Sequence, residues 1–300
     1  MTRIVRSQAS QRGAALMLVL WLIALLTALV GGFALIARTE NMQGRTLMRG
    51  IVAENAARAG IEYALTRVAQ TEPKKQWRAD GRPYTWKYAG AEIEVKMVDE
   101  DGKVDINQAD VTLLGNLLKA VGVEQWQAKK LGAVIVDWRD PDQLTQPSGG
   151  GEDNDYSAAD LPYGAKDADF ESIAELQQVL GMTPAIYKKL EPHVTVYSGR
   201  AQPDPTFASS EVLTALGMDG KNIAKQREGW DPTSGQPIPG LPGSGNALTA
   251  SASGTYSIDS KARLTDGRAA TLKAVVRTGG NSVPGLAYTA LRWEEGASQR

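Results

Sequence analysis

The longest apolar run in the chain lies near its start. The 24 residues from Ala14 to Ala37 include no Asp, Glu, Lys or Arg. As a helix rising about 1.5 Å per residue, this run would extend about 36 Å, which exceeds the roughly 30 Å hydrocarbon core of a bilayer. Because lipid offers no hydrogen bonds to the backbone, the segment must satisfy its own polar groups. The run over 14–37 therefore predicts a membrane-spanning helix.

A second pattern begins where the apolar run ends. After Ala37 the sequence becomes polar but keeps a helical period to about residue 70, and Pro73 is expected to end the helix. Apolar residues at spacings of three and four form one stripe, which consists of Ala57, Ile61, Ala64, Leu65 and Val68. We therefore predict an amphipathic helix over 38–72 that continues the membrane helix.

Segments near both ends of the remaining chain alternate with the period of a β-strand. They are 84–88, 91–98, 256–264, 271–278 and 287–294, and turn signals separate them at Ala89-Gly90, Asp266-Gly267 and Gly279-Gly280. In the second strand Ile93, Val95 and Met97 are expected to face a core. Two strands alone make a marginal sheet. The pattern thus predicts one small antiparallel sheet built from 73–100 and 255–296.

The region between the two strand sets, 101–230, has helical periodicity. Within it Ser172 and Glu175 have the spacing of a helix-capping box, and 111–121 and 125–136 are predicted helices. Residues 231–254 are rich in Gly, Pro and Ser and are expected to form a flexible connection. The predicted fold class is α+β, in which a long N-terminal helix packs on a sheet that is interrupted by a helical domain.

Composition excludes several kinds of chemistry. The 300 residues sum to a net charge of −1, whereas proteins that grip nucleic-acid backbones need a strong positive field. The chain has no cysteine, so it has neither disulfides nor a thiolate site. With His193 as its one histidine, it offers almost no material for a histidine-rich zinc site or a Ser-His-Asp triad.

The segment before the apolar run has a motif of its own. Arg3, Arg6 and Arg12 precede Gly13, which stands directly against the apolar residues. This leader resembles that of type IV prepilins and type II secretion pseudopilins, and the resemblance implies that prepilin peptidase cuts between Gly13 and Ala14 and that the new N-terminus is methylated. Residues 1–13 would then be a leader. The alternative is an uncleaved membrane anchor with a basic cytoplasmic tail.

Leu18 departs from the common pattern of that family. Most pilins and pseudopilins carry glutamate at the fifth position of the mature chain, where this sequence has leucine. A carboxylate is costly in hydrocarbon unless it meets a charge. The K-type minor pseudopilin, which is placed at the filament tip, typically lacks this glutamate. Leu18 is therefore read as a residue that determines a tip position.

An acidic segment follows the predicted helix 125–136. Between Asp137 and Glu171 there are 10 acidic and two basic residues, a net charge of −8. A solvated acidic face is one explanation of this bias. Calcium binding is the other, because short Asp side chains at close spacings on irregular backbone suit six to eight oxygen ligands. The Asp-x-Asp-x-Asp-Gly pattern of an EF-hand is absent.

The motifs of this segment carry a second resemblance. Asp-Trp-x-Asp-x-Asp from Asp137, Gly-x-Glu-Asp-x-x-Tyr ending at Tyr156, Pro162-Tyr163, and the run from Phe170 to Leu176 closely resemble K-type minor pseudopilins of the type II secretion system. The resemblance implies calcium as a structural cofactor, with the ligands Asp140, Asp142, Glu152, Asp153 and Asp155.

The same resemblance implies a role and a location. The chain would be a non-enzymatic subunit that spans the bacterial inner membrane once, with its bulk in the periplasm. It would initiate the pseudopilus at its tip with the I- and J-type minor pseudopilins, support protein export and meet secreted cargo. The inserted domain would be of the sterile-alpha-motif or helix-hairpin-helix kind.

That last feature supports a rival interpretation. Residues 172–190 resemble a helix-hairpin-helix, so the chain could be a membrane-anchored DNA receptor for DNA uptake. Thr183 stands where DNA binders usually have a second glycine, and its side chain hinders close approach of phosphate to the backbone. No nucleic-acid partner is therefore expected. A membrane-tethered hydrolase is a third and weaker alternative.

Overall fold

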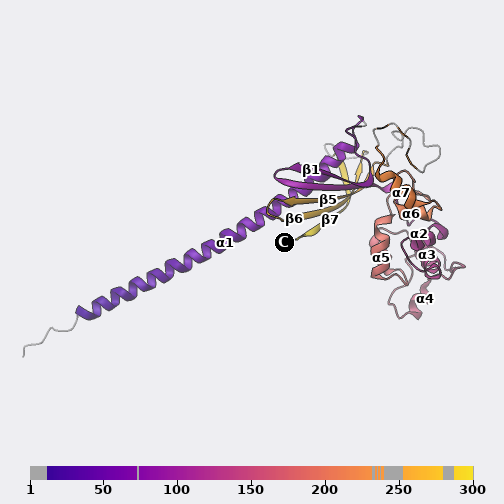
Figure 1. Cartoon of the computed structure of the whole chain (residues 1–300). Helices are drawn as coiled ribbons and strands as arrows, with labels where there is room; N and C mark the ends of the chain where they lie inside the picture. The colour runs from indigo at the N-terminus through magenta and orange to yellow at the C-terminus, as the bar shows by residue number, and fades with distance from the viewer. Residues whose placement is uncertain are drawn as a thin grey trace, which may run out of the picture. The chain divides into compact units, whose positions relative to one another are not determined.

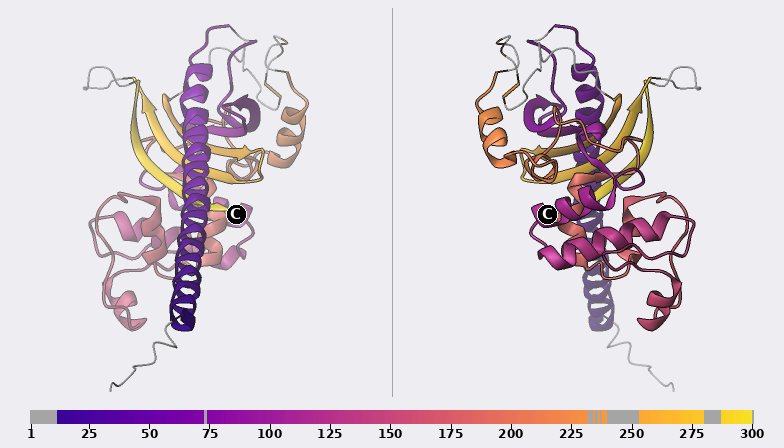
Figure 2. Two further views of the ribbon diagram at one scale, coloured as in Figure 1. Left: turned by 90° about the vertical axis from the view of Figure 1, so that its left-hand side faces the viewer. Right: turned by 90° about the vertical axis from the view of Figure 1, so that its right-hand side faces the viewer.

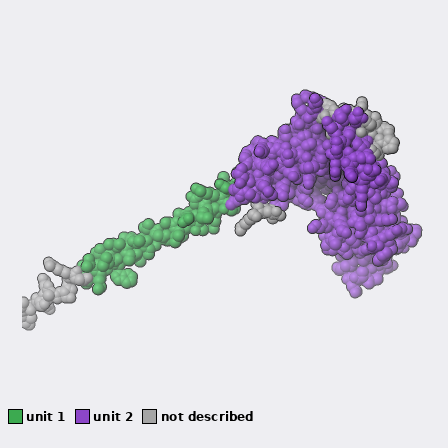
Figure 3. Space-filling model, viewed as in Figure 1, with its two compact units in different colours: residues 1–53 green, residues 54–300 purple. Residues whose placement is uncertain are grey.

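The structure is a computed structural model that describes residues 12–72, 74–231, 234, 236, 238–239, 253–279 and 287–299. The chain divides into two compact units, residues 1–53 and 54–300 (Figure 3), and each is described by itself. Four sequence predictions lie wholly or partly outside the described residues: the leader up to residue 11, Pro73 as the end of the helix, most of the connection 231–254, and Gly280 of one predicted turn.

The first unit is helical. Helix α1 (Arg12–Val68) begins just before the apolar run and continues without interruption into the second unit (Figure 1). Its apolar side chains in the predicted span are exposed, from Leu16 through Ile36. By length and composition α1 could cross a membrane, with a mean hydropathy of 2.6 in its most apolar stretch. The predicted helix over 14–37 is therefore present.

The second unit is built on a five-stranded antiparallel sheet with the order β1-β2-β5-β6-β7. The strands are β1 (Asp80–Tyr88), β2 (Ala91–Asp99), β5 (Thr255–Leu264), β6 (Ala269–Thr278) and β7 (Tyr288–Gln299). Ala89 and Gly90 join the first two strands with positive φ values of 50° and 78°, as a two-residue hairpin turn requires. The predicted strands and their antiparallel pairing are confirmed.

The C-terminal part of α1 crosses one face of this sheet (Figure 2). The predicted stripe accounts for the contact, since Ala57, Ile61, Ala64 and Leu65 are buried. On the sheet side Ile93, Val95 and Met97 are fully buried, whereas the residues between them are more exposed. The apolar side chains that recur every 3.6 residues on the helix thus pack against those that recur every second residue on the strand, and together they form one apolar layer.

The chain between β2 and β5 forms the helical region. Its elements are η1 (Glu100–Gly102), β3 (Val104–Asp105), α2 (Val111–Ala120), α3 (Gln125–Arg139), α4 (Asp153–Ala158), η2 (Ile173–Gln178), α5 (Pro184–Leu190), η3 (Glu191–His193), β4 (Val194–Thr195), α6 (Ser210–Ala215) and α7 (Gly220–Glu228). Strands β3 and β4 pair in parallel, and β3 was not predicted. The sheet is therefore interrupted by helices in the chain order that the sequence predicts.

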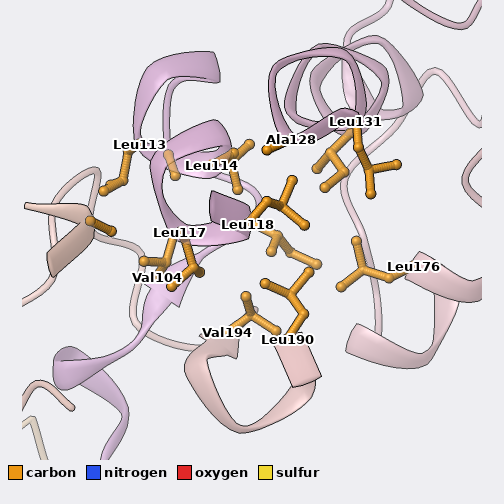
Figure 4. Packing of buried hydrophobic residues seen from close by; sticks show 14 of the residues in the cluster. Val104, Leu113, Leu114, Leu117, Leu118, Ala128, Leu131, Leu176, Leu190 and Val194 are labelled. Atoms are coloured by element: carbon orange, nitrogen blue, oxygen red, sulfur yellow. The ribbon is translucent and has the colours of Figure 1, made fainter. Parts of the chain in front are cut away.

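A separate hydrophobic core holds the helical region together. Leu114, Leu117 and Leu118 of α2 meet Leu131 of α3 and Leu190 of α5, all of them buried (Figure 4). Burying a leucine side chain contributes about 1.5–3 kcal/mol, so side chains of this kind can hold the short helices without disulfides.

Polar side chains fix the ends of the short helices. Ser172 and Glu175 form the predicted capping box, although the element that they cap, η2, is a 3₁₀-helix. Thr183 Oγ1 accepts a hydrogen bond from the Ile186 backbone N–H at 3.2 Å and caps α5. The hydroxyl that distinguishes this hairpin from DNA-binding hairpins therefore serves as a helix cap.

Candidate metal centre

The acidic segment is more ordered than its sequence predicts. Asp137 and Arg139 belong to the last turn of α3, and Asp140 is the C-cap residue of that helix. Glu152 is the N-cap residue of α4, a short helix within the segment that was expected to be irregular. Asp137 and Asp140 are three residues apart at the end of a helix, so they share one face.

Three carboxylates converge where α3 ends and α4 begins. One ligand oxygen from each of Asp137, Asp140 and Glu152 lies within 4.8 Å of the other two. Asp137 is fully buried, Glu152 is 6% exposed, and Asp140 is partly buried. Carboxylates at this separation repel one another unless a proton or a cation intervenes.

The three carboxyl groups show the effect of this crowding on their proton affinity. Burial, followed by repulsion from Asp137 and Asp140, raises the pKa of Glu152 to about 7. Burial is also the main cause that raises the pKa of Asp137 and the pKa of Asp140. Among the described atoms, Asp140 Oδ1 and Glu152 Oε1 are buried without a hydrogen-bond partner. These two oxygens are therefore available to a cation.

Asp137 also organises the loop that follows α3. Its Oδ2 accepts a hydrogen bond from the Gly151 N–H at 2.8 Å, and its Oδ1 accepts one from the Gln146 N–H at 3.3 Å. A side chain at Gly150 would overlap the Asp137 carboxylate. Asp137 thus holds the loop close to α3 while it contributes to the cluster.

The basic side chain next to the cluster does not form an ion pair with it among the described residues. The Arg139 guanidinium donates hydrogen bonds to the carbonyl oxygens of Ile106 and Ala109, and it forms no ion pair with the three carboxylates among the described residues, although its charge partly offsets that of Asp140. Lys166, the other cation of the acidic segment, pairs with Glu175 at 2.8 Å. Most of the charge of the cluster is therefore left for another partner to balance.

Aromatic rings pack between the acidic loop and the core of the helical region. Trp138 lies 5.8 Å from Tyr156 and 6.2 Å from Phe170, measured between ring centroids. Tyr156 is fully buried, and its hydroxyl accepts a hydrogen bond from the Leu180 N–H at 3.0 Å. The aromatic residues of the sequence motif therefore connect the loop to the core of the helical region.

The structure brings together two of the five predicted calcium ligands, Asp140 and Glu152. The other three carboxylates lie outside the cluster and bind backbone N–H groups: Asp142 binds Leu144, Asp153 binds Ala165, and Asp155 binds Glu152. Sequence reasoning omitted Asp137 from the ligand set. Its spacing of three residues from Asp140 on a predicted helix was the signal that could have included it.

The donor set fits a hard divalent cation. Ca²⁺ takes six to eight oxygen ligands at roughly 2.3–2.6 Å, from carboxylates, backbone carbonyls and water. The three carboxylates supply the charge and one ligand oxygen each. No sulfur or imidazole ligand is part of this cluster of described side chains, so soft transition metals are poorly matched.

The residues predicted for processing and for tip position lie at the start of α1. Gly13 and Ala14 follow Arg12 in the first turn of the helix. Leu18, one turn further, is 70% exposed on the apolar part of α1. An exposed leucine at this position is compatible with lipid or with a neighbouring apolar helix.

Comparisons with known proteins agree on one family. The family model described as "Type II secretion system (T2SS), protein K" matches residues 93–199, which include all three cluster residues. The chain is 24% identical over 208 residues to type II secretion system protein K of Pectobacterium carotovorum subsp. carotovorum, and 28% identical over 208 residues to that of Klebsiella pneumoniae. These matches cover 62% and 61% of this chain. They span 63% and 62% of the two relatives, less than two thirds of their length.

A solved structure has the same fold. It is the GspK-GspI-GspJ complex from the type 2 secretion system of enterotoxigenic Escherichia coli, in which the matched chain aligns with a TM-score of 0.55. The alignment covers 87% of this chain and 99% of the other at 17% identity. Together the comparisons show that residues 93–199 match the type II secretion system protein K domain, and that the chain is similar in sequence to proteins K of that system and in fold to a chain of the GspK-GspI-GspJ complex.

Proposed function

We propose that the chain is a minor pseudopilin at the tip of a type II secretion pseudopilus, where it initiates assembly and supports protein export. The observation that carries the proposal is the combination of an apolar helix that continues into an antiparallel sheet with a helical domain inserted between β2 and β5. A similar fold, aligned over 87% of this chain, is found in a complex that contains GspK, GspI and GspJ. The partners are accordingly the I- and J-type minor pseudopilins, the role is non-catalytic, and secreted cargo is a further possible contact.

The location follows from the same helix. Residues 14–37 span the inner membrane once, and the bulk of the chain faces the periplasm. Prepilin peptidase cuts between Gly13 and Ala14, and the new N-terminus is methylated. Intact mass should then differ by the 13-residue leader between cells with and without the peptidase, and Gly13→Leu should block the cut. An unchanged N-terminus in both strains would leave α1 as a plain anchor.

Calcium is the proposed structural cofactor. Asp137, Asp140 and Glu152 would hold it, and two buried oxygens without a hydrogen-bond partner support this assignment. The bound ion would offset the repulsion among the three carboxylates and fix the end of α3 to the start of α4.

A secretion assay tests the proposed role. Cells that lack the gene for this chain should retain their type II cargo in the periplasm, and the wild-type chain should restore export. Leu18→Glu should not improve export, because a tip subunit has no neighbour whose amine could pair with the buried carboxylate. Normal export in the deletion strain would contradict the role.

A further inference from the structure

A groove runs along one flank of α1 in the second unit. It has a volume of about 670 Å³ and lies between the helix residues 54–62 and the strands β6 and β7. Small side chains line part of it, among them Ala57 from α1, Ala270 from β6 and Ala290 from β7. Because these side chains are small, they leave the flank hollow. Side chains of another chain could enter it.

The opposite flank of α1 is closed by aromatic rings. Tyr63 stacks on Trp86 at 4.3 Å between ring centroids, and Trp77 stacks on Tyr84 at the same distance. The Tyr63 and Trp77 rings meet edge to face at 5.4 Å. These rings pack against one another and fill the space on their flank. The described residues that line the groove on the β7 side do not fill it in a comparable way.

Acidic side chains dominate the groove. Its charged lining residues are Glu54, Glu62, Glu295 and Arg58, which gives a net charge of −2. Arg58 is engaged, because its guanidinium lies 5.8 Å from the centre of the Trp293 ring. Glu62 accepts a hydrogen bond from the Tyr288 hydroxyl at 2.7 Å. Glu54 forms no ion pair with another residue that the structure describes, so it is free to meet a cation.

The groove also has the composition of a protein-binding site. Trp293, Tyr288 and Arg58 belong to the residue types that contribute most to binding free energy at protein interfaces. Tyr288 and Trp293 belong to β7, an edge strand of the sheet, and Arg58 belongs to α1. An edge strand, aromatic side chains and an unpaired charge occur together here. This combination indicates a surface that binds another protein chain.

We infer that this groove receives a basic segment of a neighbouring minor pseudopilin, with a lysine or arginine of that partner placed against Glu54. The inference rests on the proposed function, which supplies the class of partner, and it adds the contact surface and its chemistry. Charge complementarity selects a basic partner segment, and the small floor residues accommodate its aliphatic stem.

Affinity measurements on the full-length chain in detergent test the inference. Glu54→Lys reverses the unpaired charge, and Ala290→Trp fills the groove. The matched controls are Glu92→Lys and Thr85→Trp, which place the same changes on exposed positions of β2 and β1. Binding to the purified I-type and J-type proteins is measured separately, and an unchanged melting temperature establishes that each variant is folded.

Each groove variant should weaken binding to the same one of the two partners by about tenfold or more, while the controls stay within about twofold of wild type. An acidic substitution of the contacting basic residue in that partner should restore binding to Glu54→Lys. If wild type binds its partners and folded Glu54→Lys binds them equally well, the groove assignment is wrong. If wild type binds neither partner, the proposed function itself fails.

Discussion

The carboxylate of Asp137 fills the space that a side chain at position 150 would need, so Gly150 is the residue type that this site requires. Gly150→Ala should displace Asp137, which also binds the Gly151 N–H. We expect calcium affinity to fall by about tenfold or more, as for other changes around metal ligands, when measured by isothermal titration calorimetry. Gly115→Ala is the control, because its added carbon would make an ordinary 3.6 Å contact. Equal affinity in both variants would remove Asp137 from the site.

Neutralising the cluster should have opposite effects with and without calcium. In chelator, Asp140→Asn with Glu152→Gln should raise the melting temperature above that of wild type, because the variant lacks the repulsion among buried carboxylates. With calcium at a hundredfold excess over Kd, wild type should gain about 2.7 kcal/mol of unfolding free energy and the double variant nothing.

The control for that experiment is Asp142→Asn, whose carboxylate lies outside the cluster and binds the Leu144 N–H. This variant should keep the calcium-induced rise in melting temperature. A wild-type melting temperature that does not respond to calcium or chelator would mean that the three carboxylates do not form a calcium site.

Asp99 should make stability depend on pH. Burial raises its pKa to about 6 from an ordinary value of 3.8, although its oxygens accept hydrogen bonds from the Asp101 and Ser253 N–H groups. Because the folded state has the higher pKa, the contribution of Asp99 is fully present below about pH 4 and is lost as pH rises through about 6.

Comparison with Asp99→Asn isolates this effect, since all other groups titrate in both proteins. The difference in unfolding free energy, wild type minus variant, should fall as pH rises from about 4 to about 7, as measured by denaturant melts. A difference that stays constant or grows over this range would show that the pKa of Asp99 is not raised in the folded protein.

Gly60 of α1 packs directly against Ser260 of β5. A Cβ at Gly60 would overlap Ser260 Oγ and lie 2.9 Å from Ile93 Cγ2. Gly60→Ala should therefore cost about 1–3 kcal/mol of unfolding free energy. Ser260 Oγ is buried without a described hydrogen-bond partner, so Ser260→Ala alone should be close to neutral. The double variant should recover part of the lost unfolding free energy. If a double-mutant cycle shows no such recovery, Gly60 and Ser260 are not in contact.

The sequence predicts most of the fold because its patterns are local. The stripe through Ala57 and Ile61, the alternation through Ile93 to Met97, and the Ser172–Glu175 capping box each depend on residues within a few positions of one another. The predicted strand pairing across the helical region also holds, with Ile93 opposite Ala262.

The metal centre was predicted less completely for a physical reason. Two of its three carboxylates, Asp137 and Asp140, are in α3 and at the C-cap of that helix, and the third, Glu152, is at the N-cap of α4. Which carboxylates converge depends on how the loop between them folds. Asp153 and Asp155 stand next to Glu152 in the sequence, yet both bind backbone N–H groups instead. The pairing of Gly60 with Ser260 is likewise a long-range relationship that no local pattern encodes.

The composition of the purified assembly tests the central claim most directly. The full-length chain, co-expressed with the I- and J-type minor pseudopilins and extracted in detergent, should give a complex with one copy of each protein by native mass spectrometry. Copies of this chain repeated in longer assemblies, or a chain that is recovered alone beside an intact complex of the other two, would contradict a tip subunit that assembles with them.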